Sequence, residues 1–184
     1  MKLKIILAVV AMFASITNAS YAARGTDGNV SIVYWQAPSI LNPYLSSGTK
    51  DIESASLVIE PLGRYTETGA LVPFLAKEIP TVANGGVSPD LTSITWTLQE
   101  GLLWSDGTPV TSADVKFSAD YCMHPEGGCA QLAKFDGIKS ISIPDDLTIV
   151  VTFEGPMPNP YGPFMGGQTP IIQKAQFENC NCMN

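Results

Sequence analysis

The stretch ITWTLQEGLLWSDGTPVTSADVKFS, residues 94–118, carries the strongest fold signals in the chain. In its first part Ile94, Trp96 and Leu98 alternate with polar residues, which is the period of a half-buried strand. The following SDGT, residues 105–108, indicates a tight turn, because Asp accepts local backbone hydrogen bonds and Gly tolerates positive φ. The stretch therefore predicts a strand that runs into a sharp corner.

The second part of the same stretch predicts a helix from about residue 112 to residue 123. Thr111 is a favourable N-cap, and Asp114 stands three residues later, which is the spacing of a capping box with Asp in place of the usual Glu. Trp104, directly before the turn, is expected to pack beside the corner between strand and helix. Its role is predicted to be structural.

Outside this stretch the pattern consists of short strands and few helices. Residues 30–35 (VSIVYW) read as a strand, and residues 51–62 as a helix that Asp51 caps. Residues 63–73 read as a hairpin with its turn at Thr68-Gly69, and residues 139–155 as two strands around a Pro-Asp-Asp turn. The fold class expected from this order is α+β with a largely antiparallel sheet.

The first 22 residues are typical of a secretory signal peptide. Lys2 and Lys4 precede an apolar run of 12 residues, 5–16, which is shorter than the about 20 residues of a membrane-spanning helix. Small residues at Ser20 and Ala22 predict cleavage after Ala22. The alternative is an N-terminal membrane anchor. We expect a periplasmic or extracellular protein, and not a lipoprotein, because no cysteine lies near the cleavage site.

The chain of 184 residues has a net charge of −7. Removal of the two lysines in the signal peptide leaves 8 basic and 17 acidic residues, a net charge of −9. Because an acidic surface repels phosphate backbones, a nucleic-acid partner is not expected.

Four cysteines, at positions 122, 129, 180 and 182, permit three pairings. Secretion favours disulfides over free thiols. Cys122 and Cys129 bracket a short turn-rich segment, so we predict a disulfide between them and leave the pairing of Cys180 and Cys182 open. In the alternative, Cys122, His124 and Cys129 bind zinc, but no fourth ligand is evident.

Residues 94–118 closely resemble the signature of the family 5 extracellular solute-binding proteins, the peptide- and nickel-binding receptors of ABC importers. ILNPYLSSGTKDIESASLVIEPLGRYTETGALVPFLAKEI, residues 40–79, is similar to the opening of the family. DGIKSISIPDDLTIVVTFEGPMPNPYGPFM, residues 136–165, resembles a later stretch. The resemblance extends from Val30 to about Phe177.

This resemblance implies the N-terminal part of a two-lobed periplasmic-binding-protein type II fold, with mixed or antiparallel sheets and short helices. After the signal peptide, residues 1–22, it places the start of lobe I in 23–59, an inserted subdomain in 60–165 and a return toward lobe I in 166–184. Family members are much longer, so we expect the chain to be a fragment or the product of a premature stop.

The implied function is capture of a peptide or a similar small solute for transport through the membrane permease subunits of an ABC importer, by a monomer without cofactors. By position, Ser47, Gly48 and Thr49 match a stretch that pairs with the ligand backbone as an added strand. The alternative is a solvated Ser-Gly loop. Tyr34 and Trp35 are further candidate ligand-binding residues, with core packing as their alternative.

Two function classes remain as alternatives, a secreted metal-dependent or hydrolytic enzyme and a structural surface domain. Asp145-Asp146 could form a catalytic carboxylate pair, but a position between Pro144 and a strand is typical of a turn. No serine stands in a G-x-S-x-G motif, and the single histidine has no evident partner. We therefore predict no catalytic residue and no metal site.

Overall fold

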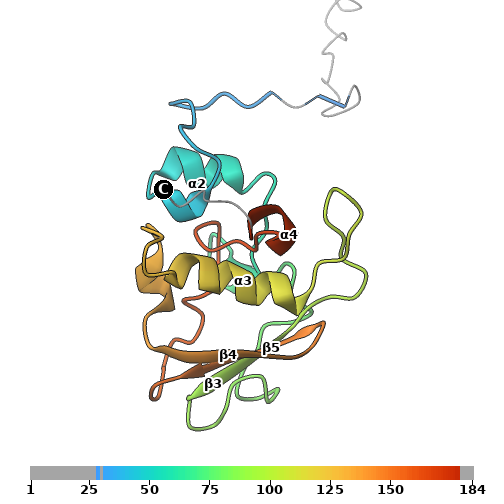
Figure 1. Cartoon of the computed structure of the whole chain (residues 1–184), viewed down its shortest axis with the longest axis vertical. Coiled ribbons are helices and arrows are strands. Elements are labelled where there is room, and N and C mark those ends of the chain that lie inside the picture. Colours follow the sequence, from blue (N-terminus) through green and yellow to red (C-terminus); the bar gives the residue numbers. More distant parts are fainter. Residues whose placement is uncertain (1–27, 30, 179–184) are drawn as a thin grey trace, which may run out of the picture. The chain divides into compact units, whose positions relative to one another are not determined.

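The computed structural model describes residues 28–29 and 31–178, so the expected signal peptide and Cys180 and Cys182 lie outside the described residues. The chain divides into two units, Met1–Tyr34 and Trp35–Asn184. The second unit contains every helix and strand that the described residues form (Figure 1). None of the helices in this described part is long and apolar enough to cross a membrane.

The centre of the second unit is a three-stranded antiparallel sheet in the order β3-β5-β4. β3 spans Ser93–Thr97, β4 spans Ile138–Asp145 and β5 spans Thr148–Phe153. At two inward positions the register places one buried apolar side chain opposite another, Ile94 with Val151 and Trp96 with Ile149. The predicted alternation is confirmed, and it directs these side chains into one core.

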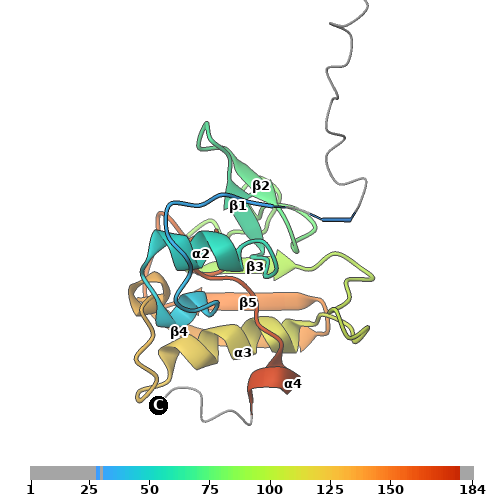
Figure 2. The same cartoon turned by 90° about the horizontal axis from the view of Figure 1, so that it is seen from above.

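Helix α3 spans Ser112–Met123, as predicted, and packs on β4 and β5 (Figures 1 and 2). Its side chains at Val115, Ala119 and Cys122 are at most 1% exposed. These positions are three or four residues apart, so they share the helix face that covers the sheet. The short 3₁₀ helix η2, Leu132–Phe135, follows α3 and adds a buried phenylalanine to the same core.

The corner between the sheet and α3 has the predicted turn. The N–H of Trp104 donates to the carbonyl of Thr108 at 2.8 Å, and the N–H of Gly107 donates to the carbonyl of Trp104 at 2.9 Å. Gly107 has φ +84°, a conformation that favours glycine. The capping box is also present, since the N–H of Thr111 donates to Asp114 Oδ2 at 2.9 Å.

The Asp114 carboxylate has further partners that local sequence patterns do not indicate. Trp104 Nε1 donates to Oδ2 at 3.4 Å, and the N–H of Lys174 donates to Oδ1 at 2.8 Å. Lys174 begins the short helix α4, Lys174–Phe177. Asp114 is buried, whereas Trp104 is only half-buried, because one side of its indole lines a cavity. A single carboxylate thus joins the corner, the start of α3 and the start of α4.

The predicted hairpin is confirmed as β1, Gly63–Tyr65, paired with β2, Leu71–Pro73, with Gly69 in the turn at φ +80°. The chain comes back to this hairpin after the sheet. The N–H of Gly166 donates to the carbonyl of Gly63 at 2.8 Å, and the N–H of Ile171 donates to the carbonyl of Glu60 at 2.9 Å. The segments on either side of residues 63–165 therefore lie together.

Two predicted elements differ from the structure. The prediction of a strand over residues 30–35 is wrong, because its described positions, 31–35, form no strand. Helix α2 spans Thr49–Ala55, so it begins before Asp51 and ends well before Pro61. Its N-cap is Gly48, because the Asp51 carboxylate binds the N–H groups of Ser39 and Ile40 instead. The 3₁₀ helix η1, Pro43–Leu45, precedes α2.

We predict that Asp114→Ala lowers the free energy of unfolding by about 2–4 kcal/mol, because it removes a helix cap and charge-assisted bonds to two other segments. Urea denaturation monitored by circular dichroism measures this loss. Asp120→Ala is the matched control on the same helix. Asp120 is exposed, and its side chain pairs with no described residue except Lys116, at 2.6 Å, so its removal should cost about 0.5 kcal/mol or less. Equal losses in the two variants would contradict the joining role of Asp114.

Candidate functional site

The 46–48 loop, formed by Ser46, Ser47 and Gly48, connects η1 to α2 and contains most of the predicted ligand-pairing stretch. The N–H of Gly48 donates to Ser46 Oγ at 3.0 Å, and the carbonyl of Gly48 accepts from Asp51 and Ile52 at 3.0 and 3.1 Å. Thr49 is already in helical conformation. Ser47 is exposed, and none of the described residues hydrogen-bonds to its backbone. Within the loop, Ser47 is the residue whose N–H and carbonyl both remain for a ligand.

Asp51 fixes one side of this loop. Its carboxylate accepts from Ser46 Oγ at 2.7 Å, from the N–H of Ser39 at 2.6 Å and from Lys50 Nζ at 2.9 Å. The Lys50 ammonium, the Ser46 hydroxyl and the Ser39 N–H together hold the pKa of the Asp51 carboxyl well below its ordinary value. Asp51 is only 3% exposed, so this charge is used inside the protein and is not available to a ligand. Sequence patterns indicated a helix cap here and missed this role.

The aromatic candidates Tyr34 and Trp35 are the last residue of the first unit and the first residue of the second. Trp35 is 70% exposed and Tyr34 is 37% exposed. Core packing, the alternative considered for both residues, does not fit the exposure of Trp35. Their role in ligand binding stays a prediction.

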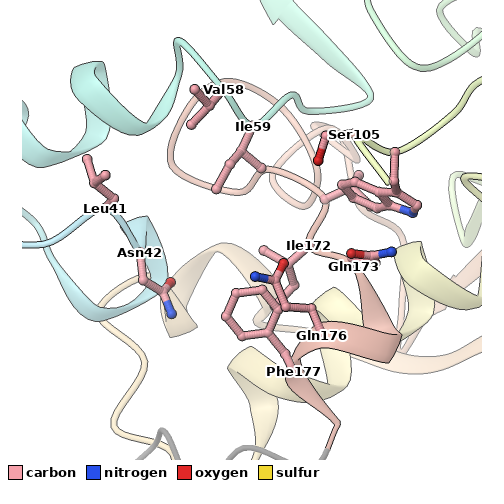
Figure 3. Close-up of a pocket in the computed structure, with 11 residues that line it drawn as sticks. Leu41, Asn42, Val58, Ile59, Ser105, Ile172, Gln173, Gln176 and Phe177 are labelled. Carbon is pink, nitrogen blue, oxygen red and sulfur yellow. The ribbon is translucent and has the colours of Figure 1, made fainter. Parts of the chain in front are cut away.

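A cavity of about 370 Å³ opens between the corner of Trp104 and the start of α4. This volume is in the range of small-molecule sites. Figure 3 shows side chains from the segments before α2, after α2 and around α4 arranged about it. Its lining contains no charged side chain and is formed by Leu41, Asn42, Val58, Ile59, Trp104, Ser105, Ile171, Ile172, Gln173, Gln176 and Phe177.

The lining of the cavity is mostly apolar, and three of its side chains, Asn42, Gln173 and Gln176, carry amide groups. Asn42 donates to the Tyr121 hydroxyl at 3.1 Å, and Gln173 donates to Asp106 Oδ2 at 2.8 Å. The side-chain amide of Gln176 has no hydrogen-bond partner among the described residues, and Figure 3 shows this side chain at the cavity. Such a lining suits an uncharged group with hydrogen-bonding capacity. The cavity was not predicted, because its walls come from residues far apart in the sequence.

The chemistry of the remaining candidates is structural. Cys122 and Cys129 form the predicted disulfide, so both sulfur atoms of the zinc alternative are already used. Among the described residues, no group of three or more His, Cys, Asp or Glu side chains could hold a metal ion. Asp145 Oδ1 accepts from the N–H of Leu147 at 2.9 Å, and this bond holds the pKa of Asp145 below its ordinary value. Asp145 therefore has the turn role and not that of a protonated acid.

Comparison with known proteins gives consistent matches. The model of the family described as "Bacterial extracellular solute-binding proteins, family 5 Middle" matches residues 70–181. Protein XP55 of Streptomyces lividans is 32% identical over 142 residues, which are 76% of this chain and 24% of that protein. A probable peptide ABC transporter periplasmic-binding protein of Sinorhizobium fredii is 38% identical over 77 residues, which are 41% of this chain and 14% of that protein. The chain thus spans a quarter or less of these two relatives.

A solved structure extends the similarity to the fold. The PBP AgaA of A. tumefaciens R10, in complex with agropinic acid, matches with a TM-score of 0.69 and 28% sequence identity. The match covers 80% of this chain and 29% of that chain. The α+β fold described above is therefore part of a binding-protein fold.

We predict that Asp51→Asn lowers the stability at pH 7 and flattens its dependence on pH in acid. The folded pKa of Asp51 lies below the unfolded value of about 3.9, so its stabilising effect is present above that value and is lost as the pH falls. Urea midpoints between pH 7 and pH 3 measure the effect. Glu53→Gln, an exposed carboxylate on the same helix, is the control and should leave the profile unchanged. A profile of Asp51→Asn parallel to that of the parent would disprove the role of this carboxylate.

Proposed function

This chain belongs to family 5 of the bacterial extracellular solute-binding proteins, and from that membership we propose that it forms part of a receptor that captures a peptide or a similar small solute. The captured solute passes to the permease subunits of an ABC importer. The observation that carries the proposal is the family match over residues 70–181. The peptide-binding name of the Sinorhizobium relative supports peptides as the solute class.

The proposed receptor acts by binding alone, as a monomer, in the periplasm or outside the cell after removal of residues 1–22. Residues 23–59 and 166–184 belong to lobe I, and residues 60–165 form its inserted subdomain. The hydrogen bond from the Tyr44 hydroxyl to the carbonyl of Pro170, at 2.6 Å, supports this division, because it joins the two lobe I segments.

The proposed ligand contacts are backbone contacts at the 46–48 loop, with Ser47 at their centre. A peptide that lies along Ser47 accepts from its N–H and donates to its carbonyl, as in an added strand. Such pairing reads the peptide backbone and is independent of peptide sequence. Gly48 and Thr49 contribute less in this arrangement, because Gly48 is already hydrogen-bonded and Thr49 begins α2.

The affinity of this chain for peptides is predicted to be weak. Each hydrogen bond contributes about 0.5–1.5 kcal/mol net, whereas association costs several kcal/mol of lost translational and rotational freedom. A few backbone bonds on one wall of a cleft give a dissociation constant on the order of millimolar. The remainder of the affinity comes from a second wall, which this chain does not supply in our proposal.

Titration of ¹⁵N-labelled chain, residues 23–184, with trialanine and pentaalanine tests the proposal by NMR. Shifts centred on Ser47 and saturating at millimolar concentrations are expected. Ser47→Pro removes the N–H and should weaken binding about three- to tenfold. Ser47→Ala keeps the N–H, removes only the hydroxyl and should bind as the parent does. Equal binding by the proline variant would refute backbone pairing at Ser47. Micromolar binding by the parent would refute the need for a second wall.

A further inference from the structure

The disulfide links the end of α3 to the segment that contacts the 46–48 loop. Cys122 lies in the last turn of α3, and Cys129 follows it by seven residues. Between them the N–H of Gly127 donates to the carbonyl of His124 at 2.9 Å, which closes a tight turn. The N–H of Gln131 then donates to Cys129 Sγ at 3.4 Å. The Cys129 sulfur of the disulfide therefore also accepts a hydrogen bond from the backbone of Gln131, and this bond helps to orient Gln131.

Gln131 reaches the backbone of η1 and of the 46–48 loop, although it is 85 residues away from Ser46 in sequence. Its Nε2 donates to the carbonyl of Ser46 at 2.8 Å and to the carbonyl of Pro43 at 3.4 Å. The N–H of the preceding Ala130 donates to the carbonyl of Tyr44 at 2.8 Å. Gln131 is only 5% exposed, so these bonds form away from water and leaving their groups unpaired is costly.

These contacts determine which backbone groups of the 46–48 loop are already hydrogen-bonded and which remain for a ligand. Residues 130 and 131 donate to the carbonyls of Pro43, Tyr44 and Ser46, and Asp51 accepts from the Ser46 hydroxyl. Ser46 is thus held by its carbonyl and by its side chain, whereas Ser47 is exposed and none of the described residues hydrogen-bonds to its backbone. The peptide group between Ser46 and Ser47 is planar and trans, so its C=O and N–H point in opposite directions, and fixing the Ser46 carbonyl also fixes the direction of the Ser47 N–H.

We propose that Gln131, oriented by the Cys122–Cys129 disulfide, is a positioning residue that fixes the conformation of the 46–48 loop for ligand pairing. The effect on ligand pairing rests on the function proposed above. The effect on the loop does not, since it concerns the free protein. Neither Gln131 nor the disulfide contacts the ligand in this proposal.

Amide hydrogen exchange of the chain without ligand tests the positioning directly. Gln131→Met keeps the length of the side chain and removes its donors. The amides of Leu45, Ser46 and Gly48, which hydrogen-bond within this turn, should exchange about tenfold faster, as expected for the loss of about one supporting hydrogen bond. The Cys122→Ser/Cys129→Ser variant should show the same local acceleration. Amides of β3 and β5 should keep their protection.

Gln99→Met is the matched control. The Gln99 amide also donates to backbone carbonyls, those of Phe74 and Ala76, but it lies outside the loop, and its replacement should leave residues 45–48 unchanged. Unchanged exchange at residues 45–48 in Gln131→Met would overturn the proposal. Uniform acceleration across the sheet would also overturn it, because it would show a general loss of stability and no positioning.

A measurement without mutation covers the case in which a variant does not fold. In the unmodified chain, nuclear Overhauser effects should join the Gln131 side-chain amide protons to Ser46 and Ser47, and that amide should exchange slowly. Absence of these signals would overturn the proposal. This test is independent of peptide binding. If Gln131→Met loses loop protection while the parent chain binds no peptide, the receptor function is refuted and the positioning role stays in place.

Discussion

The Asp114 carboxylate is the interaction on which the arrangement of the second unit depends. It caps α3 through Thr111, accepts from the Trp104 indole and receives the first N–H of α4 at Lys174. A buried carboxylate with several donors is stable only if all of these donors stay in place. The corner, the central helix and the returning segment are therefore mutually dependent. The cavity of about 370 Å³ is lined in part by the corner, at Trp104 and Ser105, and by α4, at Gln176 and Phe177, so Asp114 joins two of the segments that form its walls.

Hydrogen bonds between residues that are distant in sequence hold η1 and the 46–48 loop in place. Tyr44 is completely buried, and its hydroxyl donates to the carbonyl of Pro170 at 2.6 Å. Burial raises the pKa of this hydroxyl, so it remains a neutral donor. η1 is thus hydrogen-bonded both to the returning chain, through Tyr44, and to Gln131, through the carbonyl of Pro43. The 46–48 loop starts from a rigid turn, although it lies at the surface.

The sequence predicted the elements whose determinants are local. The bounds of α3 follow from the Thr111 cap, and the core face of β3 follows from the alternation at Ile94 and Trp96. The family was identified from the motif in residues 94–118, and the family match confirms it. The disulfide was predictable from a short spacing in a chain expected to be secreted. Gln131 and the cavity were not predictable, because both depend on contacts between residues tens of positions apart. The bonds from Asp51 to Ser39 and Ile40 were missed because they lie outside the spacing of a helix cap. The strand expected at residues 30–35 is absent from the described positions 31–35, because β-propensity alone does not determine where a strand forms.

The charges around the candidate site constrain what it can recognise. Lys50 and Asp51 neutralise each other at 2.9 Å, and both are largely buried. The cavity lining also contains no charged side chain. In our proposal, a ligand in the cavity therefore meets hydrogen-bonding groups and apolar surface, and the described residues that line the cavity offer it no charged side chain. In the proposed receptor, discrimination between ligands by charge would come from another part, while the 46–48 loop would contribute backbone hydrogen bonds that any peptide of suitable length can form. The tight fixation of Ser46 fits such a role, because a generic contact gains affinity mainly by being pre-organised.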